Sequence, residues 1–112
     1  MLTYMTFGER CTQIRKRKKI SQAQIGRALK IDGDAYGRYE RDEVKPSIEM
    51  ATKIANALDI SLDYLVGKID LELDNDMIKR IQSISKLPDK EKEYVFIFLD
   101  SFIDRMKLKG II

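Results

Sequence analysis

The chain has no histidine and a single cysteine among its 112 residues. Histidine is the usual catalytic base near neutral pH and the commonest metal ligand, so its absence argues against both kinds of site. One cysteine excludes an intramolecular disulfide. Cys11 shares a helical phase with Phe7 and Ile14, which predicts a buried thiol. No nucleophile–base pair and no glycine-rich phosphate loop stands out either, so we expect no enzyme and no metal site.

Long apolar runs are also missing. The longest uninterrupted one spans residues 94–99, far short of the roughly 20 residues that cross a bilayer. The first residues lack the basic segment and the apolar core of a signal peptide. We therefore expect a cytoplasmic protein that does not bind membranes.

The net excess of positive charge is small, but it is unevenly distributed along the chain. The net charge of +3 falls entirely within residues 1–67, whereas residues 68–112 carry nine basic and nine acidic side chains. With a pI near 9.0, this distribution favours an anionic partner for the first part of the chain.

Apolar spacing and capping residues predict an all-α chain. The helices are expected at residues 7–18, 22–29, 33–41, 48–58, 62–66, 76–85 and 88–107. Ser21, Asp32, Ser47 and Ser61 are the expected N-caps. Gly67 suits the left-handed position after the fifth helix. Residues 1–67 then form one domain and 76–112 a C-terminal helical hairpin. Residues 68–75 are a linker, which the sequence leaves open as a short strand or a packed segment.

The pattern of residues 20–40 predicts two short helices joined by a tight turn. Ile25 and Leu29 lie on one face of the first helix, and Gly26 permits a close approach between the two backbones. Tyr36 and Tyr39 point inward from the second helix. This is the layout of a helix-turn-helix, whose second helix enters the DNA major groove.

Exposed polar positions of this motif are candidate DNA contacts. Arg38 is the best base reader among them, because a guanidinium can bond O6 and N7 of guanine together. A phosphate contact or a solvated side chain remains the alternative for Arg38. Positions beyond the second helix are candidate phosphate clamps, which position a protein without reading sequence. The full candidate set is Gln22, Gly33, Asp34, Arg38, Arg41, Lys45, Ser47 and Arg17.

The densest basic run covers residues 15–19. These side chains cannot all face one way on a helix, so some only solvate the surface. Arg15 directly follows the expected core position Ile14. We expect it to pair with Glu40 at the end of the second helix of the motif, with two unrelated surface charges as the alternative.

Residues 7–67 resemble the helix-turn-helix domain of the Xre family, the lambda-repressor-like and Cro-like fold. The matching segments are Phe7-Gly8-Glu9-Arg10, Ile14-Arg15, Ile20-Ser21-Gln22, Ala35-Tyr36, Arg38-Tyr39-Glu40, Lys45-Pro46-Ser47 and Ile60-Ser61-Leu62-Asp63-Tyr64-Leu65. The resemblance implies a five-helix domain that binds a palindromic operator as a dimer, without a cofactor. It also implies the Arg15–Glu40 pair and DNA contacts at Gln22, Gly33, Asp34 and Arg38.

Two departures from the family pattern affect the motif. Lys30 occupies a turn position that is usually glycine. A left-handed lysine costs about 1–2 kcal/mol, so a different turn is expected. The second helix begins with Asp32-Gly33-Asp34 instead of Ser or Thr followed by Gln or Arg. Both acids approach DNA phosphates, which predicts modest affinity or an unusual readout.

The last helix carries more apolar side chains than one neighbour can cover. Large apolar patches are uncommon on soluble monomers, so a symmetric dimer is the economical interpretation. A dimer supplies two recognition helices about 34 Å apart. The alternative is a helix folded onto its own N-terminal domain. The expected interface residues are Val95, Phe98, Leu99, Phe102 and Met106.

The sequence thus favours a homodimeric transcriptional repressor that binds double-stranded DNA. One alternative is an antitoxin-like module whose C-terminal helices bind a partner protein. Another is an interaction module that has lost DNA affinity, which the Asp32 and Asp34 acids suggest.

Overall fold

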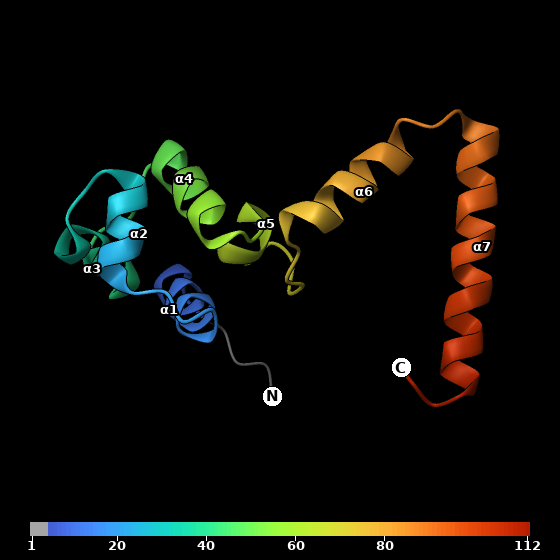
Figure 1. Ribbon diagram of the computed structural model, residues 1–112, viewed down its shortest axis with the longest axis horizontal. Coiled ribbons are helices and arrows are strands. Elements are labelled where there is room, and N and C mark those ends of the chain that lie inside the picture. The colour runs from blue at the N-terminus through green and yellow to red at the C-terminus, as the bar shows by residue number, and fades with distance from the viewer. Residues whose placement is uncertain (1–4) are drawn as a thin grey trace. The chain divides into compact units, whose positions relative to one another are not determined.

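The computed structural model describes residues 5–112, and this range contains seven α-helices and no strand (Figure 1). The helices are α1 (Phe7–Arg17), α2 (Gln22–Leu29), α3 (Gly33–Glu40), α4 (Ile48–Leu58), α5 (Leu62–Leu65), α6 (Asn75–Ser85) and α7 (Asp89–Leu108). The all-α prediction is confirmed. The chain divides into two compact units, of which the first ends at Asn75 and the second spans Asp76–Ile112.

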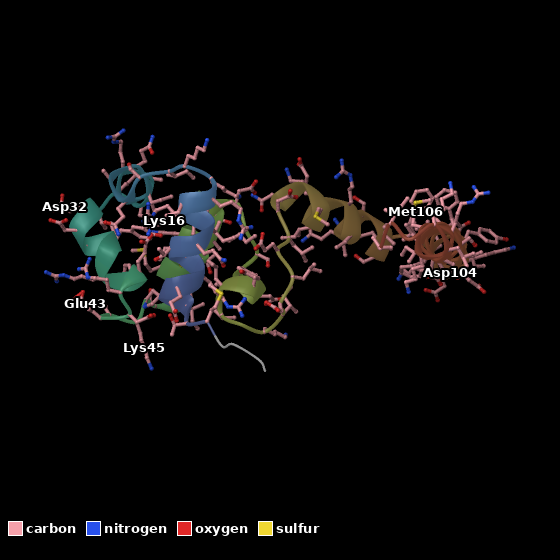
Figure 2. All side chains as sticks on the ribbon, turned by 90° about the horizontal axis from the view of Figure 1, so that it is seen from below. Lys16, Asp32, Glu43, Lys45, Asp104 and Met106 are labelled. Carbon is pink, nitrogen blue, oxygen red and sulfur yellow. The ribbon has the colours of Figure 1, made fainter. Side chains whose placement is uncertain are left out.

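Capping side chains fix where most helices of the first unit begin. The hydroxyls of Ser21, Ser47 and Ser61 each accept a hydrogen bond from the backbone N–H three residues later, as the sequence predicts. Thr6 does the same for α1 and forms a capping box with Glu9. Asp32 stands at the N-cap position of α3, but its side chain makes no capping hydrogen bond. Its carboxylate points to the outside of the unit instead (Figure 2).

The turn between α2 and α3 forms without a glycine at position 30. Lys30 adopts the left-handed conformation, with φ 62° and ψ 40°, so the expectation of a different turn is wrong. The N–H of Ile31 donates to the carbonyl of Gly26 over 2.9 Å and closes the end of α2. A Cβ at position 26 would stand 2.8 Å from the Ile31 carbonyl oxygen. Gly26 is therefore the residue that this turn requires.

The core of the first unit lies among α1 to α5. α1 packs on α3, α4 and α5, α2 packs on α3 and α4, and α4 packs on α5. Cys11, Ile14 and Tyr36 are almost fully buried at its centre, as expected. The other buried members are Ile25, Leu29, Ile54, Ala55, Leu58, Ile60, Tyr64 and Leu65.

Residues 68–74 are an irregular, mostly exposed segment and not a strand, and Asn75 begins α6. Backbone and side-chain hydrogen bonds tie the end of this segment to the turn before α5: Ser61 N–H donates to the Leu73 carbonyl, and Asn75 N–H donates to Asp59 Oδ1. Two of its acids pair with α1: Asp70 with Arg10, and Glu72 with Arg17. The segment therefore belongs with the first unit.

The second unit differs from the packed helical hairpin that the sequence predicts. α6 and α7 do not pack extensively on each other, and no residue of either helix is buried. The end-on view of α7 in Figure 2 shows side chains on all sides, with Met106 and Asp104 pointing in different directions. A helix that is apolar on several sides cannot bury all of these sides against one short neighbouring helix. None of the described helices is long and apolar enough to cross a membrane.

Candidate nucleic-acid interface

The exposed face of α3 carries Asp34 and Arg38. They are four residues apart and therefore share one side of the helix. The opposite side holds Tyr36, which is fully buried, and Tyr39, which is half-buried. Because Tyr36 fixes the rotation of α3, the Arg38 guanidinium faces away from the core.

The loop after α3 extends this surface with further polar groups. Arg41 is exposed and pairs with Glu43, with 2.6 Å between Nε and Oε2. Lys45 is exposed and points away from the unit, as Figure 2 shows. The Ser47 hydroxyl accepts the Met50 N–H over 3.0 Å, which leaves its own O–H free to donate to an anion.

Gly33 and Gln22 are less exposed than the sequence suggests. Gly33 packs against the first turn of α2, where an added Cβ would stand 3.1 Å from Cα of Ala23. Gly33 has no side chain, so only its backbone groups can contact a ligand. Gln22 is half-buried, and its Nε2 donates to Glu40 Oε1 over 3.0 Å.

Arg17 lies apart from this surface. Its guanidinium pairs with Glu72 of the segment 68–74. The hydrogen bond that Arg17 donates to Glu72 raises the pKa of Arg17. Because Arg17 lies on α1, outside α3 and the loop that follows it, we leave Arg17 out of the set of DNA contacts proposed below.

Arg15 and Glu40 form the ion pair that the sequence predicts. Arg15 Nε donates to Glu40 Oε2 over 2.6 Å, and Nη2 donates to Oε1 over 3.1 Å. A third bond runs from Nη1 to the carbonyl of Ile20 over 2.9 Å. The side chains of Arg15 and Glu40 are 11% and 3% exposed. The pair thus locks α1 and the loop before α2 onto the end of α3.

The electrostatics of this pair favour the charged forms. Burial by itself raises the pKa of Glu40, but the hydrogen bonds from Arg15 and Gln22 outweigh it, so the pKa lies below its usual value. The same pair raises the pKa of Arg15. Burial, together with the Glu40 and Asp42 carboxylates, raises the pKa of the Cys11 thiol to about 12. Cys11 is therefore a neutral core residue at physiological pH.

Arg10 is a buried residue that sequence reasoning missed. It is 8% exposed, and its guanidinium carbon lies 4.6 Å from the centre of the Tyr64 ring. Its Nη1 is 3.4 Å from Asp70 Oδ1. Nothing local marks this arginine as buried, because the ring that covers it comes from α5 and the carboxylate from the segment after it.

The described residues contain no group of cysteines and carboxylates that could hold a metal ion. The surface instead presents an exposed arginine on a rigidly held helix, with serine and lysine groups beyond it. Such a surface suits a polyanion that also carries hydrogen-bonding groups which an arginine can contact.

Comparisons with known proteins agree with this description. A family model described as helix-turn-helix matches residues 12–65. The cryptic phage CTXphi transcriptional repressor RstR of Vibrio cholerae serotype O1 is 32% identical to the chain and aligns over 96% of both proteins. The immunity repressor protein of Bacillus phage phi105 is 31% identical over 79% of this chain and 67% of the repressor.

Solved structures show the same likeness. The P22 c2 repressor in complex with a synthetic operator is 35% identical, with a TM-score of 0.53 over 56% of this chain and 96% of that one. The solution structure of the DNA-binding domain of the P22 c2 repressor reaches a TM-score of 0.57 at 34% identity. That match covers 68% of this chain and 99% of the domain.

Proposed function

Because the chain belongs to the helix-turn-helix family of Xre-like transcriptional regulators, we propose that it is a repressor that binds operator DNA through α3. α3 lies in the major groove, and Arg38 reads a base edge there. The proposal places the protein in the cytoplasm together with its DNA. Relatives named as phage repressors and the likeness to a repressor–operator complex support this assignment.

The observation that carries the proposal is the rigid support of the exposed α3 face. Arg15 and Glu40 clamp α3 to α1, and Tyr36 anchors the inner side of the same helix. A recognition helix held in this way can present Arg38 to base pairs at low entropic cost. Asp34 shares the exposed face and can accept a hydrogen bond from N4 of cytosine.

Groups around α3 supply the phosphate contacts in this proposal. Lys45, which points outward in Figure 2, and the exposed Ser47 follow α3 in the chain. Arg41 joins them by exchanging Glu43 for a phosphate, since an exposed ion pair holds its partners weakly. These contacts fix the position of the protein on DNA and depend strongly on salt.

We further propose that the second unit forms a homodimer. The side of α7 formed by Val95, Leu99, Phe102 and Met106 is apolar, and Phe102 is 53% exposed in the single chain. α7 carries five acidic and four basic residues, so two copies do not repel each other strongly. Burial of this side against a second copy removes the apolar surface from water. Two chains then present two α3 helices to an inverted repeat.

Selection of the purified full-length protein against random duplex DNA tests this function. Sequencing of the retained DNA is expected to show an enriched inverted repeat, with half-sites about one helical turn apart. Enrichment of single half-sites would argue against the dimer but would still support sequence-specific DNA binding. A folded protein that enriches no sequence at low salt would contradict the proposal and favour a protein partner for α6 and α7.

A further inference from the structure

The carboxylate of Asp42 ties the loop after α3 to the start of α1. Its Oδ1 accepts the backbone N–H of Gly8 over 3.0 Å, and its Oδ2 accepts the hydroxyl of Thr6. The same hydroxyl accepts the N–H of Glu9, so it donates to one partner and accepts from the other. Both oxygens of Asp42 are therefore bound by donors at the N-terminus of another helix.

The start of α1 lies directly on the last turn of α3. A Cβ at position 8 would stand 2.3 Å from the Glu40 carbonyl oxygen and 2.6 Å from that of Tyr39. Only a glycine permits this approach, which brings the Gly8 N–H within reach of Asp42. Asp42 adopts φ 58°, and its own N–H donates to the Tyr39 carbonyl over 3.1 Å. Backbone and side chain together thus fix the start of the loop.

This loop carries two of the proposed phosphate contacts. Lys45 and Ser47 follow Asp42 by three and five residues, and both are exposed. Lys45 points away from the unit in Figure 2. Asp42, Lys45 and Ser47 line one hollow together with Phe7 of α1. The loop therefore runs along the start of α1, at the place where Asp42 holds it.

The negative charge of Asp42 is at first sight unfavourable beside phosphate contacts. An acidic group in such a place repels a polyanion, so its removal should by itself raise DNA affinity. Asp42 instead directs its carboxylate to the N-terminus of α1, where the helix dipole favours a negative group. A holding role and a purely electrostatic effect thus predict opposite changes in affinity when the carboxylate is removed.

We propose that Asp42 is a positioning residue for DNA binding. Its carboxylate holds the loop after α3 against α1, so that Lys45 and Ser47 meet phosphates while Arg38 contacts a base edge. The inference rests on the proposed function, in which these three side chains contact DNA. It assigns a role to a residue that makes no DNA contact of its own.

The test compares Asp42→Gly with the parent in the whole chain. Affinity is measured for the DNA selected by the parent and for random duplex, each over a series of salt concentrations. Glycine adopts the left-handed conformation without strain, so the variant loses the carboxylate and keeps the turn. We expect about three- to tenfold weaker binding to both DNAs and a salt slope reduced by about one, because Lys45 no longer stays near a phosphate. The ratio of selected to random affinity should not change.

Asp42→Asn separates the hydrogen bond from the charge. Its amide oxygen can still accept the N–H of Gly8, whereas the negative charge is gone. We expect an affinity at or above that of the parent and a salt slope no smaller than the parental one. The Tm of each variant is measured as well, since a purely structural role would lower the Tm and leave the salt slope unchanged.

Glu43→Gly is the matched control, because it removes an exposed acid and adds a glycine at the next position of the same loop. Glu43 pairs with Arg41 and not with α1. Its loss should leave DNA affinity unchanged or raise it, since Arg41 is released. Lys45→Ala is made in two backgrounds and should weaken binding less in Asp42→Gly than in the parent, because both changes act through one contact.

Each outcome supports or contradicts a separate statement. Equal or tighter binding by a folded Asp42→Gly protein would overturn the inference, because only the charge would then matter. Equal weakening by Asp42→Asn or Glu43→Gly would also overturn it, since the bonds to α1 would not be the cause. The same holds for a Lys45→Ala effect of equal size in both backgrounds. A parent that binds no DNA would refute the proposed function itself, and that measurement precedes all variants.

Discussion

At the scale of single residues, the Glu40 carboxylate connects three parts of the first unit. It accepts hydrogen bonds from Arg15 on α1 and from Gln22 on α2, and it stands at the end of α3. A buried carboxylate with a full set of partners is stable only while all of them remain. Loss of one partner is therefore more costly here than at the surface.

Arg15→Ala is expected to lower the free energy of unfolding by about 3–5 kcal/mol, because it leaves the Glu40 charge buried without its guanidinium. Urea unfolding followed by circular dichroism measures this difference. Arg41→Ala is the control, since its pair with Glu43 is about half exposed and contributes about 1 kcal/mol at most. Equal losses for both variants would show that the buried pair is no stronger than a surface pair.

The lowered pKa of Glu40 predicts how stability depends on pH. A carboxyl whose pKa is lower in the folded state stabilises the fold fully above its unfolded pKa, near 4.5. That contribution disappears as the pH falls through the lower, folded value. Urea unfolding between pH 3 and 7 should therefore show that the free energy of unfolding of the parent falls below about pH 4.5. The fall should be smaller in Glu40→Gln, which lacks the titrating carboxyl. Identical slopes for parent and variant would contradict the assignment.

Arg38→Ala tests the proposed base contact. We expect a loss of discrimination of about 1–3 kcal/mol at one base position in each half-site, with random-DNA affinity nearly unchanged. Binding to the selected DNA and to its single-base changes gives both quantities. Lys45→Ala provides the contrast, since loss of a phosphate contact weakens all DNA alike and reduces the salt dependence. Parallel losses in Arg38→Ala would make Arg38 a phosphate contact.

At the scale of elements, the α2–α3 turn shows which local rule is strict. Gly26 cannot gain a Cβ, because the Ile31 carbonyl and the Gly33 backbone nitrogen lie within 3 Å of that position. Lys30 tolerates φ 62° at an energetic cost, since a left-handed backbone strains a side chain without forbidding it. The steric contact therefore determines the turn, and the strained lysine accommodates it.

Lys30→Gly is expected to raise the free energy of unfolding by up to about 1.5 kcal/mol. It removes a left-handed strain of about 1–2 kcal/mol but adds about 0.5–1 kcal/mol of backbone entropy in the unfolded chain. Arg27→Gly, in the right-handed part of α2, should instead cost about 1 kcal/mol. Thermal or urea unfolding checks the pair of variants, and a Lys30→Gly protein as destabilised as Arg27→Gly would show that no strain was present.

At the scale of the whole molecule, the two units differ in burial and in the role that we propose for each. The first unit has a buried core and bears the proposed DNA contacts, whereas no helical residue of the second is buried. A single α3 contacts only one half-site, so pairing of chains raises affinity through effective concentration. The function we propose therefore belongs to the dimer.

Phe102→Asp should convert the dimer to a monomer and weaken operator binding, because it places a charge in the apolar side of α7. Sedimentation measures the oligomeric state, and circular dichroism checks that the first unit keeps its fold. Ile97→Asp is the matched control. Ile97 is 56% exposed and lies about half a turn around α7 from the side that contains Phe102. This variant should remain dimeric. An unchanged sedimentation profile for Phe102→Asp would eliminate this interface.

The sequence by itself determined the helices and their order in the first unit. Capping serines and apolar spacing act within a few residues, so the starts of α2 and α4 are found where the pattern predicts them. The pairing of Arg15 with Glu40 was also accessible, through the family resemblance and the position of Arg15 beside the core. The proposed contacts Arg38 and Lys45 were accessible in the same way, as exposed basic side chains on and after α3.

Only the tertiary structure decided which polar groups are buried and which distant groups pair. Arg10 is buried under Tyr64, Gln22 donates to Glu40, and the exposed Arg17 pairs with Glu72. Each of these partners is distant in the chain, and burial of a charge depends on what folds over it. Local pattern cannot supply that information, because hydrogen bonds between distant segments form only when the core brings those segments together.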